Sequence, residues 1–493
     1  QDAQFLYMES EDNHIQVTAV ALFDPSTVPG GDVVRFKDIL AHVDSRLHMN
    51  PLFRRRLVRV PLELDFPYWV DDENFDLEYH IQHARLPDPG DWRQLCIQLA
   101  RFHARPLDLS RPLWEMLVIE GLDRVAGLPE GCYAIATKLH HAAVDGASIV
   151  KYFGALMDID NQGTPAVPLD AYEATRSPRP NIFQMGTRAV WNTVRSPIGM
   201  TDAVMRSAPA LYRWAQDSLR AQRKQSRSVP DTRFNCNSSP HKMFDATTVK
   251  LSELKKIREA VPGCTINDVV LAICGGALRR YLDHHRELPD DSLVAWVPIN
   301  ARSGTSSESE GPGNRITSMT TPIFTDIDDA LVRLQTIHAA TSKSKAARAG
   351  VSARLMTDLS QHVPAATLVT AGRLVLRAGM AANICNLFIS NVPGPLVPMY
   401  MNGARQIATY GIAPLVDGMG LFIATPSYDG KMTFNVTSTR ETLPDIDFFI
   451  ECIESSLASL KQAASSSKAK PRTTKRKKAA KKKATKKTAT RKT

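Results

Sequence analysis

The sequence lacks the short motifs on which many enzyme classes depend. None of its seven cysteines forms a Cys-x-x-Cys pair, and there is no His-Glu-x-x-His segment or spaced set of Cys and His that suggests a metal site. There is also no Gly-x-Ser-x-Gly elbow, Gly-x-Gly-x-x-Gly fingerprint or Walker A sequence. We therefore expect no metal, no permanently bound cofactor, no serine nucleophile of the hydrolase type and no common dinucleotide fold.

Two further absences concern the compartment of the protein. The first residues do not follow the basic, apolar and small-residue order of a signal peptide. No run of about 18 apolar residues could cross a bilayer. Scattered cysteines favour buried thiols in a reducing compartment, so a cytoplasmic protein is expected.

The positive charge of the chain is concentrated at its C-terminal end. The net charge is +10, but residues 468–492 hold 14 Lys and Arg and no acidic residue, so the rest of the chain is slightly acidic. We expect this Lys-rich tail to be disordered and able to bind polyanions, either an acidic membrane or nucleic acid. A solvated tail that only aids solubility is the alternative.

Strand-like and helix-like segments alternate in two parts of the chain, which predicts an α/β (α+β) fold with two related subdomains. Strands are expected at 14–23, 113–122, 132–139, 292–300, 387–393, 420–430 and 431–439. Helices are expected at 35–47, 92–103, 147–159, 251–261, 265–282, with Thr265 as the N-cap, and 448–460. The expected division is a first unit at 1–160, a Pro-rich and basic helical crossover at 161–240, a second unit at 241–462 and the tail at 463–493.

The crossover contains aromatic and aliphatic residues interleaved with arginines between 181 and 227. This pattern is typical of a helix that lies on an anionic lipid surface. A crossover helix that packs on the body of the protein is an equally good interpretation.

The segment HHAAVDG at 140–146 is the strongest candidate for chemistry, because it lies between a predicted strand and a predicted helix. A neutral imidazole there could take a proton from a hydroxyl group, and we assign this role to His141. His140 could shape the turn or support His141, while Asp145 and Gly146 could fix the loop through an ion pair or a helix cap. The other histidine pair, His284-His285, lacks this context and is expected at the surface.

This segment matches the HHxxxDG motif of the coenzyme A-dependent acyltransferase superfamily. The chain most resembles the bacterial wax ester synthase/diacylglycerol acyltransferases. Further matches are DAQFLYMES at 2–10, SRPLWE at 110–115, IND at 266–268, SNVPGP at 390–395 and YGIAP at 410–414. The resemblance covers residues 1–462 and leaves out the tail.

The resemblance implies two chloramphenicol acetyltransferase-like subdomains, flanked by helices, with the active site in a tunnel at their interface. It implies an acyl-CoA donor and an acceptor that is a fatty alcohol or diacylglycerol. Because a thiolate is a good leaving group, we expect no covalent intermediate. An HHxxxDG enzyme that forms polyketide- or peptide-type esters or amides is the alternative. Lipid substrates also imply a peripheral location, at the inner face of the cell membrane or on lipid droplets.

The matching segments supply further candidate residues. Asn267 and Asp268 could cap a helix, or Asn267 could donate a hydrogen bond near the oxyanion. Arg302, after a predicted strand, is the candidate ion-pair partner of Asp145. The candidate substrate-binding residues are Pro112, Leu113, Trp114, Ser390, Asn391, Pro393 and Gly394. The first three fit the core better than a substrate contact, and the SNVPGP segment could equally form a plain turn.

Overall fold

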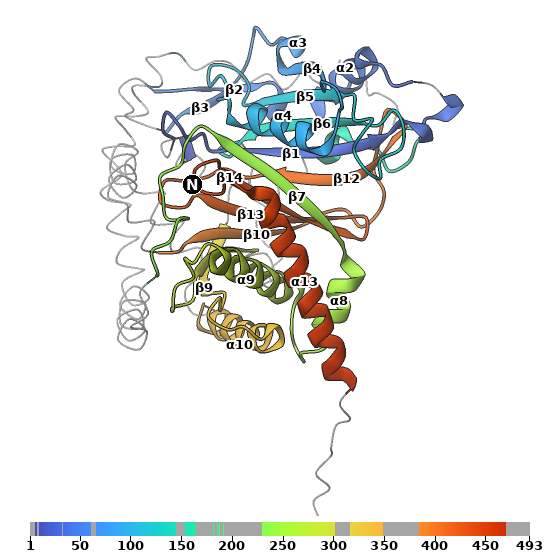
Figure 1. Cartoon of the computed structure of the whole chain (residues 1–493). Coiled ribbons are helices and arrows are strands. Elements are labelled where there is room, and N and C mark those ends of the chain that lie inside the picture. The colour runs from blue at the N-terminus through green and yellow to red at the C-terminus, as the bar shows by residue number, and fades with distance from the viewer. Residues whose placement is uncertain are drawn as a thin grey trace, which may run out of the picture.

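A computed structural model describes most of the chain. The described residues are 5–6, 9–31, 33–60, 66–143, 153–163, 181, 185, 187, 191, 229–300, 316–348 and 384–469. Within them, two six-stranded sheets and a small hairpin carry the fold (Figure 1).

The first sheet has the strand order β11-β12-β1-β6-β5-β4. Its strands are β1 (Gln16–Asp24), β4 (Ile81–Arg85), β5 (Trp114–Glu120), β6 (Tyr133–His140), β11 (Tyr400–Met401) and β12 (Ala404–Ile412). Both faces are covered, because Leu95 and Leu99 of α4 (Trp92–Ala104) pack on one face, whereas Ile39 and Val43 of α2 (Phe36–Asp44) pack on the other. Smaller elements are α3 (Leu77–His80), the hairpin of β2 (Arg55–Val58) and β3 (Tyr68–Asp71), and the 3-10 turns Pro25–Thr27, Pro29–Gly31, Leu47–Met49 and Pro51–Phe53.

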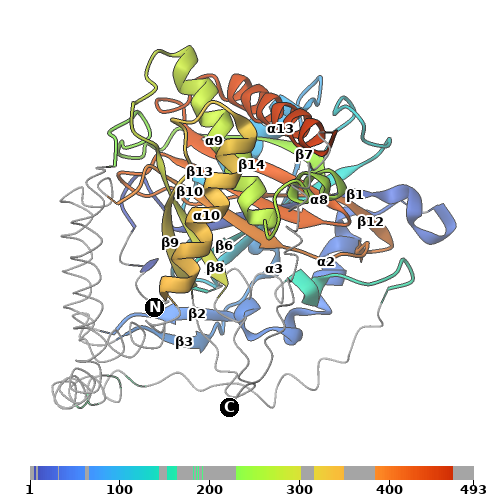
Figure 2. The same ribbon diagram turned by 90° about the horizontal axis from the view of Figure 1, so that it is seen from below.

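The second sheet has the order β7-β14-β13-β10-β8-β9 and mixes parallel with antiparallel pairs. Its strands are β7 (Lys242–Lys250), β8 (Val294–Asn300), β9 (Ile316–Pro322), β10 (Leu387–Pro393), β13 (Leu421–Tyr428) and β14 (Lys431–Thr439). The helices packed against it are α8 (Leu251–Arg258), α9 (Ile266–His284), α10 (Ala330–Arg348) and α13 (Ile446–Ala469). In Figures 1 and 2, α9 and α10 lie on the side of this sheet that faces away from the first sheet.

The two sheets are joined by strands that cross between them. β12 comes from the C-terminal part of the chain but pairs antiparallel with β1, as when Ala19 lies opposite Gly411. The hydroxyl group of Thr433 on β14 donates to the carbonyl of Thr409 on β12 at 3.0 Å. The first sheet therefore contains strands from both sides of the expected boundary at 240/241, because β11 and β12 belong to it.

The structure confirms the predicted strands and most predicted helices within two or three residues, although α13 continues well past residue 460. Thr265 is the N-cap of α9, as predicted. The consecutive strands β13 and β14 form a hairpin, whose turn residues Asp429 and Gly430 have φ values of 42° and 75°. Positive φ at both positions matches a two-residue turn that joins twisted strands. The regions 144–152 and 301–315, most of 181–227 and residues 470–493 of the tail lie outside the described residues. The expected start of a disordered tail at 463 is wrong, because residues 463–469 continue α13.

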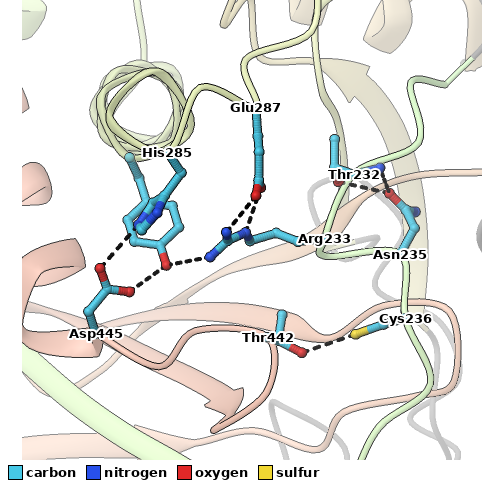
Figure 3. A network of polar contacts seen from close by, with 9 residues as sticks. Thr232, Arg233, Asn235, Cys236, His285, Glu287, Thr442 and Asp445 are labelled. Carbon is cyan, nitrogen blue, oxygen red and sulfur yellow. Dashed lines mark hydrogen bonds and ion pairs between the residues drawn. The ribbon is translucent and has the colours of Figure 1, made fainter.

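The expectation for the pair His284-His285 was half wrong. His284 is exposed, but His285 has a side chain only 24% exposed, and its Nε2 lies 3.1 Å from Oδ2 of Asp445. Figure 3 shows this pair beside the bidentate pair of Arg233 with Glu287. The pair of Arg233 with Glu287 joins the segment before β7 to the C-terminal end of α9, and the pair of His285 with Asp445 joins that end to the start of α13. His285 therefore has a structural role.

Candidate active site

His141 stands directly after a buried strand. Every residue of β6 is buried, and the strand ends at His140. The next residues turn, with the N–H of Ala143 bonded to the carbonyl of His140 at 2.9 Å. The N–H of His141 donates to the carbonyl of Ile15 at 2.9 Å, and its ring lies 4.2 Å from the ring of Phe5 between centroids. The imidazole is therefore fixed at one end of the β1–β6 pair.

His140 has a different environment, because it is 1% exposed and both of its ring nitrogens are engaged. Its Nδ1 accepts the N–H of Ala142 at 3.0 Å, so the ring hydrogen belongs on Nε2. That nitrogen donates to Oε1 of Glu9 at 3.1 Å. A ring whose nitrogens are both used in this way holds the turn that carries His141.

Glu9 connects this turn to the start of β1. Its Oε1 also accepts the N–H of Ile15 at 3.0 Å. Burial raises the pKa of the Glu9 carboxyl, but the hydrogen bonds and charge from His140 and the bond from Ile15 outweigh burial, so the net pKa is lowered. The carboxylate therefore stays ionised at neutral pH and stabilises the Nε2-protonated ring of His140. Glu9 lies in the segment 2–10 that resembles the family, yet nothing in that segment marks it as the partner of a histidine 131 residues away.

A cavity of about 400 Å³ lies between the two sheets, and His141 is part of its wall. Most of the described residues that line it come from β1, β6 and β12 on one side, from β10 and β13 on the other, and from 153–157. Along β6 the lining extends from His141 to Ile135, a distance of about 20 Å at 3.3–3.4 Å per residue. The wall is mostly apolar, and it includes the adaptable side chains of Met116, Met157, Met399 and Met401. An elongated apolar cavity that ends at a histidine suits an alkyl chain whose reactive end lies at the imidazole.

The SNVPGP segment contributes alternate residues to this cavity. Ser390 and Gly394 line it, whereas Asn391 and Pro393 occupy the alternate positions, whose side chains leave the opposite face of β10. A Cβ on Gly394 would lie 2.2 Å from the carbonyl oxygen of Ser427. Glycine is therefore needed there for β10 and β13 to approach each other.

The residues Pro112, Leu113 and Trp114 lie outside the described lining of the cavity and support β6. Leu113 and Trp114 are each 1% exposed. The carbonyl of Leu113 accepts the N–H of His140 at 3.1 Å, and the indole N–H of Trp114 donates to the carbonyl of Phe53 at 2.9 Å. The structure thus places this segment in the core behind the histidine turn.

Asn267 and Asp268 begin α9, and neither is among the described residues of the cavity wall. Asp268 is fully buried and forms a capping box with Thr265. Its carboxylate also accepts hydrogen bonds from Thr341 at 2.8 Å and His338 at 3.1 Å, both on α10. These contacts join the first turn of α9 to α10. Asp145, Gly146 and Arg302 lie outside the described residues, so their roles stay predictions.

Buried polar side chains behind β1 and β6 were not expected from the sequence. Lys138 is fully buried, and its Nζ lies 2.9 Å from Oε2 of Glu115, its cross-strand neighbour on β5. The same ammonium group donates to the carbonyls of Phe102 and Arg105 at the end of α4, at 3.2 and 2.9 Å. Burial lowers the pKa of Lys138 although Glu115 raises it.

Among the described residues, no group of three or more His, Cys, Asp and Glu could hold a metal ion.

His103 lies in the same layer and is expected to make stability depend on pH. Its side chain is 2% exposed, and its Nδ1 lies 2.9 Å from Oγ1 of Thr18. Burial, together with the charges of Lys138 and Lys242, lowers its pKa to about 3. In the unfolded chain this histidine takes up a proton near pH 6.5, whereas in the folded chain it does not. Its contribution to the free energy of unfolding is therefore complete above pH 6.5 and is lost progressively as the pH falls towards 3.

We therefore predict that His103 alone lowers the free energy of unfolding by about 2 kcal/mol between pH 7 and pH 5. Urea unfolding at several pH values checks this. Between pH 7 and pH 5, the free energy of unfolding of a His103→Gln variant should fall less than that of the wild type, whatever its value at pH 7. A His284→Gln variant, changed at an exposed histidine, should keep the wild-type slope. Equal slopes for wild type and His103→Gln would contradict the prediction.

Comparison with known proteins places this geometry among lipid acyltransferases. The wax ester synthase/diacylglycerol acyltransferase catalytic domain model matches residues 1–270, and the WS/DGAT C-terminal domain model matches residues 312–461. A putative diacylglycerol O-acyltransferase of Mycobacterium bovis is 30% identical over 94% of this chain and 98% of its own length. The O-acyltransferase WSD of Acinetobacter baylyi is 31% identical, over 78% of this chain and 81% of its own length. The wax ester synthase/diacylglycerol acyltransferase structure from Marinobacter aquaeolei VT8 has a TM-score of 0.65 at 26% identity, covering 94% of this chain and 98% of that one.

Proposed function

The chain belongs to the wax ester synthase/diacylglycerol acyltransferase family, and on this basis we propose that His141 is the general base of its acyl transfer. The enzyme transfers an acyl group from acyl-CoA to the hydroxyl group of a fatty alcohol or of diacylglycerol. The observation that carries the proposal is the position of His141 in the wall of an apolar cavity about 20 Å long. Such a cavity can hold a long alkyl chain out of water while its reactive end lies at the imidazole.

The proposed reaction needs one proton carrier. His141 removes the proton of the acceptor hydroxyl group while its oxygen attacks the thioester carbonyl carbon. The tetrahedral oxyanion then collapses, the C–S bond breaks, and the protonated imidazole returns the proton to the CoA thiolate. A thiolate leaves readily, so a covalent acyl-enzyme is not required. General base catalysis contributes about 10²- to 10⁴-fold, and holding both substrates in place contributes further.

Neighbouring residues are proposed to position His141 and the substrates. His140 and Glu9 fix the turn that carries His141 through the hydrogen bond of 3.1 Å between them. Asp145 and Gly146 are proposed to shape the following loop, with Arg302 as the partner of Asp145. Ser390 and Gly394 are proposed as part of the substrate wall.

Product analysis tests the proposed function. The purified chain is given palmitoyl-CoA with hexadecanol and dipalmitoylglycerol together, and thiol release and ester products are both measured. We expect one thiol released per ester formed, and the ratio of wax ester to triacylglycerol gives the acceptor preference. Thiol release without ester, or no thiol release with either acceptor, would contradict the proposal.

A peripheral site at a lipid surface is also proposed. The described helices contain no segment long and apolar enough to cross a bilayer. The loop after β10 exposes two aliphatic side chains, Leu396 at 76% and Val397 at 56%. On either side of them, Pro395 and Met399 line the cavity. The loop is therefore a thin wall with the cavity on one side and solvent on the other.

A third exposed aliphatic residue lies beside this loop. Asp158 and Tyr400 exchange backbone hydrogen bonds of 2.8 and 2.9 Å, so the two segments run together. Ile159, next to Asp158, is 78% exposed, while Met157 on its other side lines the cavity. Contact of these aliphatic side chains with lipid would bring the cavity wall against the source of apolar substrates. The Lys-rich tail is proposed to add attraction to anionic lipid or another polyanion.

We predict that a Leu396→Ser, Val397→Ser double variant binds vesicles at least about 10-fold more weakly, because two aliphatic side chains no longer enter the lipid. Co-flotation with phosphatidylcholine vesicles that contain diacylglycerol measures this, and phosphatidylglycerol vesicles report the contribution of the tail. The matched control is Val33→Ser, since Val33 is 78% exposed but outside the described lining of the cavity. Unchanged flotation of the double variant would exclude the loop as the contact.

A further inference from the structure

We propose that Gly411 lets the cavity accept long alkyl chains, because a glycine at this position leaves open a passage that a larger side chain would close. Gly411 lies on β12 and is part of the cavity wall. A Cβ placed on it would meet no atom within 4 Å, so the space next to its Cα is open. This inference rests on the proposed function, since it concerns a substrate chain that starts at His141.

The strand register gives the position of Gly411 relative to His141. Gly411 lies opposite Ala19 on β1, which lies opposite Thr137 on β6, so these three residues form one row across the sheet. Thr137 precedes His141 by four residues, which is about 13 Å along the strand, and Gly411 is two strands away, about 10 Å to the side. The row therefore crosses the cavity roughly 16 Å from His141.

This distance corresponds to a defined part of a lipid chain. With C–C bonds of about 1.5 Å in an extended zigzag, 16 Å is reached near the twelfth or thirteenth carbon. The cavity continues past this row, because the next row on the same face, formed by Ile135, Ala21 and Thr409, also lines it. A chain of sixteen carbons would pass Gly411, whereas a chain of eight would end before it.

The residues around Gly411 keep the passage open at this point. Its row contains only small side chains, Thr137 and Ala19. The N–H of Gly411 donates to Oδ1 of Asn435 on β14 at 3.2 Å, which holds the backbone of β12 close to the second sheet. Because this bond uses the backbone, a larger side chain at position 411 would enter the cavity without breaking it. The added atoms would then occupy the space of the distal carbons.

The chain that passes Gly411 can belong to the acyl donor or to the acceptor, and the experiment separates these sources. In one series, acyl-CoA donors of 8 to 18 carbons are tested with a fixed short alcohol. In the other, alcohols of 8 to 18 carbons are tested with a fixed short acyl-CoA. Each series is measured by thiol release as kcat/KM for wild type, Gly411→Ala and Gly411→Leu.

We expect Gly411→Leu to lower the ratio of kcat/KM for 16 carbons to that for 8 carbons at least 10-fold in one of the series, and Gly411→Ala to lower it less. A shift in the donor series assigns the passage to the acyl chain, and a shift in the alcohol series assigns it to the acceptor. Val33→Leu is the control, because it adds one carbon to a side chain that is 78% exposed and outside the described lining of the cavity. It should keep the wild-type ratio.

An unchanged ratio in both series would overturn the inference, as would an equal loss at every chain length. If Gly411→Leu fails to fold, the smaller Gly411→Ala change still decides the question through its ratio. Wild type that releases no thiol from any acyl-CoA would instead refute the proposed function, so the two failures are distinguishable.

Discussion

Replacing His141 by alanine is expected to lower kcat by about 10²- to 10⁴-fold, because the acceptor hydroxyl group then loses the base that removes its proton. Binding of acyl-CoA should change little, since most of the cavity wall comes from other residues. The cleanest measurement is thiol release at saturating palmitoyl-CoA and alcohol, with acyl-CoA affinity measured separately. Activity within a few-fold of wild type would rule out His141 as the base.

Two other histidine variants make this result specific. His284→Ala changes an exposed histidine at the end of α9, and its kcat should equal that of wild type. His140→Ala removes the hydrogen bonds to Glu9 and Ala142 and should lower both stability and activity, because the turn that carries His141 loosens. A loss of activity in His141→Ala at unchanged thermal stability therefore separates chemistry from the integrity of the turn.

The parts of this site that could be predicted from the sequence are those whose residues lie close together along the chain. The local order of strand, HHAAVDG and helix was enough to single out His141. The cavity wall was not predictable, because β12 reaches β1 across nearly 400 residues of sequence. The strand ARQIATYGI was also missed as a strand, since Gln406, Thr409 and Gly411 stand at cavity-lining positions where large apolar residues would mark a buried strand.

The residues that support the site were missed for the same reason. Glu9 and His140 meet over 131 residues, and neither residue carries a local signal for the other. The conformational roles were easier to predict, since Thr265 and Asp268 cap α9 through contacts within one helical turn. The sequence thus predicted the ends of the elements and singled out the histidine that lies in the cavity wall, whereas the packing between distant strands decided what surrounds that histidine.

Lys138 shows most clearly how packing between strands decides the surroundings of a residue, since a buried lysine in a strand requires a partner of opposite charge. The fully buried ammonium group has Glu115 at 2.9 Å on the neighbouring strand. We predict that Glu115→Ala lowers the free energy of unfolding by about 3–5 kcal/mol, because it leaves a buried charge without its counter-charge. Urea unfolding measures this loss. As a control, Asp123→Ala removes one partner of the exposed pair with Arg85 and should cost less than about 1 kcal/mol.

The double variant Glu115→Leu, Lys138→Met tests whether the cost comes from the uncompensated charge. Two apolar residues of similar size remove both desolvation penalties, so the double variant should be more stable than Glu115→Ala. Full recovery is not expected, because Lys138 also donates to the carbonyls of Phe102 and Arg105 at the end of α4, which would lose this donor. A double variant less stable than Glu115→Ala would mean that these two hydrogen bonds, and not the ion pair, are the main contribution of Lys138 to the strand that ends at the histidine turn.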